Sequence, residues 1–420
     1  MGNLLTRSSV ILGVFSNRAF AVFTYGNSVS LIGLWVQRLA VGWLAWDMTQ
    51  SGFWLGAVAF ADLFPVILVG PFAGVFADRL NQQRIIIICR VLSAIQAVVL
   101  AVLVYFGTAT IEVVFALTLF GGTVTGIQQP ARLAIVSSLV RPEHLGSAVA
   151  INSVVFNLAR FVGPAIAGVL ITSAGTFVAF ALAAVGHVIS AATFWRVRLA
   201  VEERAPRHGM MADLAEGARY AFSHAAIGPM LMLAIIGSLL ARPIFELLPG
   251  FADAVFGRGA GGLAILTSSV GIGAIVAGLW LAQRGGVRGL TAITLGSFAV
   301  IGVLSTAFAL TGWFWLGALL MAAAGGAMVI NGTGTQTLIQ TAVARHMRGR
   351  VLGIWGIIFR GGPAIGAFVM GWLAEYWGFG PPVALGGVLC LVAAMVMYPR
   401  RARLAQVLEG DSAVAGGVAE

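Results

Sequence analysis

The amino-acid sequence predicts an all-α membrane protein with twelve transmembrane helices in two pseudo-symmetric six-helix bundles. The 420 residues are 59% hydrophobic and 10% charged, with a mean hydropathy of +0.97, so the chain has too little polar surface for a water-soluble globule. Apolar segments of about 20 residues or more, the length that crosses a bilayer, recur twelve times. Short sequence echoes at half the chain length predict that the helices form two related halves.

Twelve helices and five regions follow from this pattern. We predict helices at 17–46, 52–77, 85–106, 111–138, 146–172 and 175–195, then at 226–250, 260–283, 289–310, 312–341, 351–376 and 381–398. The regions are a cytoplasmic N-terminus (1–16), an N-terminal bundle (17–195), a central cytoplasmic loop (196–225), a C-terminal bundle (226–398) and a cytoplasmic tail (399–420).

The central loop is the one long polar segment between the helices. Residues 210–224 place apolar side chains at helical spacing, which predicts an interfacial helix linking the two halves. The alternative is a solvated linker.

The distribution of basic residues predicts the orientation in the membrane. All 25 are arginines, and those outside the predicted helices gather in alternate loops and in the tail, whereas the opposite loops contain only Arg258. By the positive-inside rule, both termini and the central loop are cytoplasmic in a bacterial inner membrane. This placement beside apolar spans explains the net charge of +10 without nucleic acid as a partner.

Two echoes relate the halves to each other. The segment Gly-Val-Phe-Ala-Asp-Arg from Gly74 recurs in degenerate form from Gly278, and Gly-Pro-Ala-Ile recurs at Gly163 and Gly362. Their offsets, 204 and 199 residues, are close to half the chain. Paired halves with a substrate path between them are typical of transporters.

The same segments resemble motifs of a known family. The loop Gly74-Val-Phe-Ala-Asp78-Arg79-Leu-Asn-Gln-Gln-Arg84 lies between the second and third predicted helices and resembles motif A of the major facilitator superfamily. The segment Gly163-Pro164-Ala-Ile-Ala-Gly168 in the fifth helix is similar to motif C of its exporters and antiporters, in which small residues allow close helix approach. The resemblance implies the major facilitator fold, conformational gating by these residues and efflux.

A finer resemblance points to the transmembrane secretion effector branch, which includes enterobactin-type siderophore exporters. It covers about residues 15–400 and rests on Ser30-Leu-Ile-Gly33, Thr49-Gln-Ser51, Pro130-Ala-Arg132, Asn152, Asn157-Leu-Ala-Arg160, Ala241-Arg242-Pro243 and Glu246-Leu-Leu-Pro249. It implies a secondary active transporter that exports an amphipathic small molecule, such as a drug or siderophore, by alternating access coupled to protons. In relatives the carboxylate that corresponds to Asp78 meets the start of the eleventh helix, so the resemblance implies that Asp78 acts as a cytoplasmic latch.

Two positions depart from this pattern. Leu117 occupies the place where other proton-coupled members carry an arginine in the fourth helix, and Asn81 replaces the usual glycine of motif A. The absence of an arginine at Leu117 weakens the argument for proton coupling. The replacement of glycine by Asn81 weakens the argument for a tight cytoplasmic latch.

Charged residues inside the predicted helices are the candidate site, because a charge at a helix centre costs about 2.5 to 3.5 kcal/mol and therefore faces a partner or a polar cavity. The candidates for proton coupling or the substrate cavity are Asp62, Glu246, Arg242, Arg38, Gln37, Arg160 and Arg360. Asp62 is the first candidate for carrying a proton and Glu246 the second. Arg242 and Glu246 are one helical turn apart and can pair, and Pro243 between them permits a kink. The alternative for all of these charges is a structural role in helix packing.

Other function classes stay open at this point. A uniporter or importer on the same scaffold, or a membrane assembly or sensor protein, would have the same composition. We do not expect an enzyme, a cofactor or a metal, because the histidines and the two cysteines, Cys89 and Cys390, lack ligand spacing. We expect His187 to be a histidine packed in the core and the two cysteines to be packed free thiols. We expect a monomer whose partners are its substrate, protons and the lipid bilayer.

Overall fold

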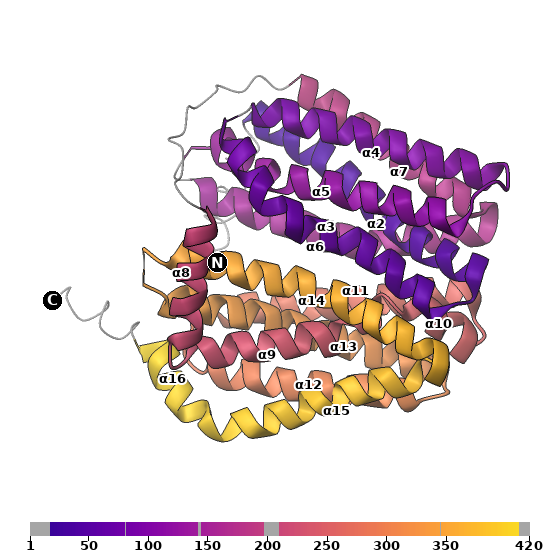
Figure 1. Cartoon of the computed structure of the whole chain (residues 1–420). Coiled ribbons are helices and arrows are strands. Elements are labelled where there is room, and N and C mark those ends of the chain that lie inside the picture. Colours follow the sequence, from indigo (N-terminus) through magenta and orange to yellow (C-terminus); the bar gives the residue numbers. More distant parts are fainter. Residues whose placement is uncertain (1–16, 80, 142–143, 197–209, 345, 411–420) are drawn as a thin grey trace, which may run out of the picture. The chain divides into compact units, whose positions relative to one another are not determined.

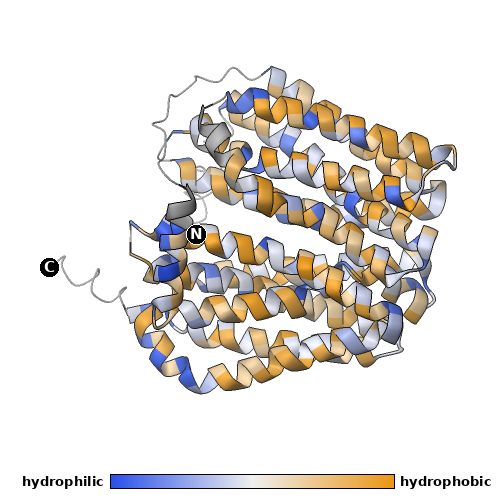
Figure 2. Ribbon diagram, viewed as in Figure 1, coloured by the Kyte–Doolittle hydropathy of each residue, from blue (hydrophilic) through white to orange (hydrophobic). Residues whose placement is uncertain are grey.

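The computed structural model describes residues 17–79, 81–141, 144–196, 210–344 and 346–410. In this part of the chain, twelve helices are long and apolar enough to cross a membrane, and no strand is present (Figure 1). Figure 2 shows apolar residues along most of the length of these helices. A bilayer offers no hydrogen-bond partners, so spanning segments satisfy their backbone groups internally as helices. The predicted fold class is confirmed.

The helices fall close to the predicted ranges. The first half contains α2 (Arg18–Thr49), α3 (Gly52–Arg79), α4 (Gln82–Tyr105), α5 (Ile111–Leu139), α6 (Leu145–Ala174) and α7 (Thr176–Trp195). The second half contains α9 (Ile227–Leu240), α11 (Gly259–Arg284), α12 (Leu290–Leu310), α13 (Phe314–Ala342), α14 (Arg348–Trp377) and α15 (Gly380–Met397). Two further helices are α8 (Met210–Ser223), in the segment predicted to be helical between the halves, and α16 (Arg401–Glu409) in the tail.

The seventh predicted helix, 226–250, is wrong as a continuous element. It ends at Leu240 and is followed by the 3-10 turn η2 (Arg242–Phe245), the single turn α10 (Leu248–Gly250) and the π-turn η3 (Phe251–Val255). Pro243 has no N–H and its ring clashes with the carbonyl four residues earlier, which breaks an α-helix at this point. Arg242 and Glu246 therefore do not share one face of a regular helix.

The chain divides into two compact units. Unit 1 comprises residues 1–48 and 64–207, and unit 2 comprises residues 49–63 and 208–420. The first part of α3 thus belongs to unit 2, where the hydroxyl of Ser51 donates to the carboxylate of Glu375 on α14 at 2.9 Å.

The two halves repeat a helix ending that only glycine adopts easily. Gly175 follows α6 and Gly378 follows α14, with φ angles of 92° and 74°. In both, the glycine N–H bonds to the carbonyl four residues earlier, at Ile171 and Ala374, which is a common way to end a helix. This shared ending supports the internal repeat.

Two short helices pack on unit 2. On α8, the carboxylate of Glu216 pairs with Arg350 of α14 at 2.8 Å. On α16, Leu404 and Leu408 are buried, and the carboxylate of Glu409 accepts the backbone N–H groups of Gly289 and Thr291 at the start of α12, at 2.5 and 2.8 Å. An anion at a helix N-terminus is stabilised by the helix dipole.

Candidate functional site

Two of the predicted site residues meet in unit 1, around one indole ring. The guanidinium carbons of Arg38 on α2 and Arg160 on α6 lie 5.3 and 5.6 Å from the ring centre of Trp35. Both distances lie within the range in which a cation is attracted to the face of an aromatic ring. Arg38 and Arg160 are half-buried, so their charges are neither fully solvated nor sealed in the core.

Close packing of α2 against α6 makes this arrangement possible. A side chain at Gly163 would come within 2.5 Å of the Trp35 Cβ, so glycine is required where the helices cross. Phe156 packs edge-on against Trp35, with ring centres 5.9 Å apart. Pro164 lies within α6, and Gly168 is buried one turn further on. The predicted motif C residues thus lie beside the cluster of Trp35, Arg38 and Arg160, which we call the Trp35 cluster.

The Trp35 cluster is rich in hydrogen-bond donors. The indole N–H of Trp35 is buried and has no hydrogen-bond partner among the described residues. Guanidinium and indole groups can only donate hydrogen bonds. The cluster therefore combines two positive charges with a buried hydrogen-bond donor.

Gln37, the third candidate from this region, belongs to a separate amide chain. Its side-chain amide donates to the carbonyl oxygen of Gln96 on α4 at 2.7 Å, and the Gln96 amide donates to the backbone carbonyl of Leu117 on α5 at 3.1 Å. These bonds link three helices, which indicates a structural role for Gln37.

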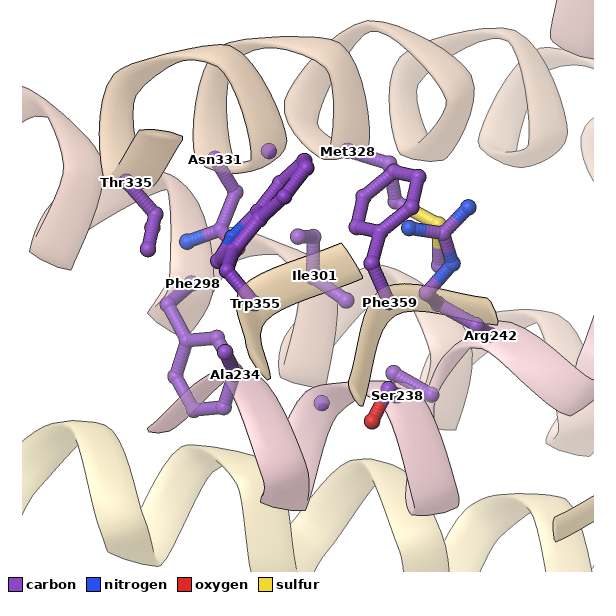
Figure 3. Close-up of a pocket in the computed structure, with 13 residues that line it drawn as sticks. Ala234, Ser238, Arg242, Phe298, Ile301, Met328, Asn331, Thr335, Trp355 and Phe359 are labelled. Atoms are coloured by element: carbon purple, nitrogen blue, oxygen red, sulfur yellow. The ribbon is translucent and has the colours of Figure 1, made fainter. Parts of the chain in front are cut away.

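Unit 2 contains a pocket among four helices (Figure 3). Its cavity volume is about 30 Å³, room for one or two water molecules. The lining residues come from α9 and η2 (Ala234, Gly237, Ser238, Ala241, Arg242), α12 (Phe298, Ile301), α13 (Met328, Asn331, Gly332, Thr335) and α14 (Trp355, Phe359). Its wall is mostly apolar, with a few polar groups.

A cation and two rings form a column along one side of this pocket. The guanidinium carbon of Arg242 lies 3.6 Å from the ring centre of Phe359. The rings of Phe359 and Trp355 are stacked, with centres 4.6 Å apart and planes 24° from parallel. Phe359 lies between Arg242 and Trp355 in Figure 3. We call these three residues the Arg242 column.

The remaining predicted residues lie outside both groups. Asp62 is half-buried in α3, Glu246 is half-buried just after η2, and Arg360 is exposed on α14 next to Phe359. Their predicted roles stay predictions.

The motif A residues are only partly described. Gly74, Asp78 and Arg79 lie in α3, but their side chains lie outside the described residues, so the predicted latch stays a prediction. Arg84 is exposed, and its backbone N–H donates to the side chain of Asn81, which caps α4 at 3.1 Å. Asn81, the departure from motif A, therefore has a local structural use as an N-cap.

Sequence reasoning missed Arg90, the most deeply buried charged residue in the part of the chain that the structure describes. This residue of α4 is 3% exposed and donates to the hydroxyl of Ser30 and to the side-chain oxygen of Asn27, at 3.4 Å for the latter. Ser30 is also 2.9 Å from Nδ1 of His187 on α7, and Asn27 donates to Asn152 at 3.1 Å. The same signal that singled out Asp62, a charge inside an apolar span, would have found it.

Ser30 connects Arg90 to His187. A guanidinium can only donate, so the hydroxyl of Ser30 accepts from Arg90, and it also lies within hydrogen-bond distance of Nδ1 of His187. The prediction of a core histidine agrees with this environment, and the two cysteines are buried free thiols as expected.

Comparisons with known proteins agree with the fold and the motifs. The family model described as transmembrane secretion effector matches residues 10–415. Enterobactin exporters of Escherichia coli O81 (strain ED1a) and of Escherichia fergusonii are 27% identical over 413 residues, which is 94% of this chain and 96% of theirs.

Solved structures share the fold at low sequence identity. A mutant form of the peptide transporter POT superposes with a TM-score of 0.74 at 12% identity, over 93% of this chain and 96% of its own. A D-xylose–proton symporter superposes with a TM-score of 0.67 at 14% identity, over 90% and 97%.

Proposed function

Since the chain belongs to the transmembrane secretion effector family of major facilitator transporters, we propose that it exports an amphipathic small molecule by alternating access, coupled to protons. The observation that carries this proposal is the presence of half-buried arginines beside aromatic rings in both units, because charged residues within membrane spans are rare and mark substrate or ion pathways. The similarity to exporters along nearly the whole chain supports the outward direction.

The proposed orientation has both termini and α8 in the cytoplasm of a bacterial inner membrane. Arginines in the connections on one side, and in the tail, support it through the positive-inside rule. Export then moves the substrate toward the side of the α2–α3 turn.

Asp62 is the proposed proton-carrying residue, and Glu246 is the second candidate. Asp62 lies within the span of α3 and Glu246 directly follows the seventh span, and both are half-buried, so each can meet a changing solvent environment during a transport cycle. The competing proposal is that Asp62 only holds helices together.

Proteoliposomes with an imposed pH gradient test the function. The purified protein is reconstituted and supplied with extracts of cells that lack the gene, and the compounds that accumulate against their gradient are identified by mass spectrometry. Proton-coupled export requires accumulation that depends on the pH gradient. Transport that ignores the gradient would favour a uniporter, movement in the opposite direction an importer, and no movement of any compound an assembly or sensor protein.

Asp62→Asn tests the proton carrier, since it keeps the shape of the side chain and removes its titration. We expect loss of pH-driven accumulation with substrate binding and expression retained. Asp47→Asn is the matched control, because Asp47 is exposed at the end of α2. Uphill transport by Asp62→Asn at the wild-type rate would exclude Asp62 as an essential carrier.

A further inference from the structure

The end of the chain follows the order of the layers in a bilayer. The helix α15 has 18 residues, so it is about 27 Å long, close to the thickness of the hydrocarbon core. Met395 and Val396, near its end, are 59% and 58% exposed, as side chains that face lipid are. Tyr398 follows in the turn η4 (Tyr398–Arg400) and is also exposed, and tyrosines gather at the membrane interface. This order places the start of α16 at the depth of the lipid headgroups.

The helix α16 is docked on unit 2. It turns across the end of this unit in Figure 1, and Leu404 and Leu408, one helical turn apart, are buried against the other helices. Glu409 accepts the N–H groups at the start of α12, and the hydroxyl of Thr341 at the end of α13 donates to the carbonyl of Leu408 at 3.4 Å. The position of α16 is thus tied to the ends of α12 and α13.

The exposed charges of α16 are all positive within the described residues. Arg400, Arg401 and Arg403 are exposed, and Figure 2 shows hydrophilic residues where the apolar α15 gives way to α16. The guanidinium carbon of Arg401 lies 4.4 Å from the ring centre of Tyr398. Arg400 and Arg403 make no hydrogen bond or ion pair through their side chains with any residue that the structure describes. These two arginines are therefore open to an anion outside the protein.

The arginines oppose the dipole of their own helix. The N-terminus of an α-helix carries partial positive charge, so basic residues there are unfavourable. The first turn of α16 contains no acidic residue, and no side chain caps its start. Glu409 at the other end is offset by its contact with α12, but no described residue offsets Arg400 and Arg403. A negatively charged surface at headgroup depth fits these arginines in both charge and position.

We infer that the start of α16 binds the anionic phospholipids of the inner leaflet through Arg400 and Arg403, and that this contact holds α16 on the ends of α12 and α13. The inference uses the proposed orientation and goes beyond the transport function. The positive-inside rule alone accounts for arginines at this place, but it concerns insertion and predicts no effect of lipid charge on the folded helix. Dependence of α16 on anionic lipid is therefore the distinguishing property.

Hydrogen exchange in nanodiscs tests the inference. The purified full-length protein is placed, one copy per disc, in phosphatidylcholine alone or in an equimolar mixture with phosphatidylglycerol, and exchange is followed by mass spectrometry. Each arginine near an anionic membrane surface strengthens binding about fivefold, so α16 should exchange about tenfold or more slowly in the mixture. The middle of α12 should not change. Salt at about 1 M, where the Debye length is about 3 Å, should remove most of the difference.

Substitutions identify the arginines responsible. In Arg400→Gln/Arg403→Gln, exchange of α16 should be nearly the same in the two lipids, whereas Arg400→Lys/Arg403→Lys keeps the charge and should keep most of the difference. Arg141→Gln/Arg196→Gln is the matched control, because it removes the same charge from two exposed arginines of unit 1. It should leave the lipid dependence of α16 unchanged. If the first variant fails to insert, Arg403→Gln alone should reduce the lipid dependence about fivefold.

Equal exchange of wild-type α16 in the two lipids would overturn the inference, as would an equal loss of lipid dependence in the unit 1 control. Protection that appears only in larger discs holding two copies would assign this surface to a second copy of the chain instead. The proposed function fails separately, because exchange is measured without substrate. Protein that moves no compound can retain the lipid contact, and protein whose α16 ignores lipid charge can retain transport.

Discussion

The two units hold their first and third helices together by opposite means. In unit 1, Arg90 of α4 reaches α2 through hydrogen bonds to Ser30 and Asn27. In unit 2, the ring of Phe298 on α12 packs against Gly237 of α9, where a side chain would come within 2.7 Å of the ring. Hydrogen bonds are directional, so they hold the helices of unit 1 in one geometry. The apolar contact of unit 2 is not directional, and Phe298 and Gly237 also form part of the pocket wall. The difference predicts that unit 1 is the more rigid scaffold and unit 2 the more adaptable one.

The largest expected effect tests the apolar packing of unit 2. Gly302→Ala on α12 would place a Cβ 2.7 Å from the backbone oxygen of Gly387 and 2.8 Å from the backbone nitrogen of Leu391 on α15. Backbone atoms cannot rotate away, so we expect a loss of about 1 to 3 kcal/mol in the free energy of unfolding, measured by thermal or detergent denaturation. Gly296→Ala on the same helix is the control.

Gly296 has open space around it, so its replacement should be neutral or should stabilise by up to about 1 kcal/mol, the difference in helix propensity. Equal effects of the two substitutions would show that the α12–α15 contact is not tight.

The next effect tests the polar network of unit 1. Ser30→Ala removes the acceptor of Arg90 and the hydrogen-bond partner of His187, which leaves buried polar groups unsatisfied at a cost of about 1 to 3 kcal/mol. Ser305→Ala in unit 2 is the matched control, because the Ser305 hydroxyl is buried and makes no hydrogen bond within the described residues. Denaturation of both variants should show a loss for Ser30→Ala only. A similar loss for Ser305→Ala would remove the contrast between the units.

A smaller effect is expected when the whole charge is removed. Arg90→Met replaces the buried guanidinium with an apolar side chain, and such replacements are often neutral because the cost of burying the charge disappears as well. In the double variant Ser30→Ala/Arg90→Met, most of the stability lost in Ser30→Ala should return. Additive losses in this double-mutant cycle would mean that Arg90 and Ser30 act independently.

The smallest effect concerns α16. Glu409→Gln keeps the shape but removes the charge at the start of α12, and a charge at a helix N-terminus contributes about 0.3 to 1 kcal/mol. Hydrogen exchange should become faster in α16 and at the start of α12, with α4 unchanged as the internal control. Unchanged exchange at all three places would show that Leu404 and Leu408 hold the helix without Glu409.

The sequence predicted the helices well because membrane spans are specified by apolar length. The break after Leu240 was foreseen only as a kink at Pro243, since the irregular turns up to Val255 depend on distant partners. Phe251, for example, packs against Phe308 and Phe379, with ring centres 4.8 and 5.6 Å away. Such contacts leave no periodic signal in the sequence.

The sequence predicted individual residues of the candidate site but not which of them lie together. Arg38, Arg160 and Arg242 were found because each is a charge inside a span. Their aromatic partners were not, because Trp35 and Phe359 are ordinary residues in apolar helices, and 125 residues separate Trp35 from Arg160. Only the crossing at Gly163 brings those two together.

The docking of α16 determines how the proposed topology can be measured. If alkaline phosphatase were fused after Arg403, the hybrid protein would lack Leu404, Leu408 and Glu409 and would lose the packing of α16 on unit 2. A hybrid that fails to insert would be inactive, and this inactivity could be mistaken for evidence of a cytoplasmic C-terminus. Fusion after Glu420 keeps α16 intact. There, alkaline phosphatase should be inactive and a green fluorescent protein should fluoresce, and the opposite result would invert the orientation of the whole chain.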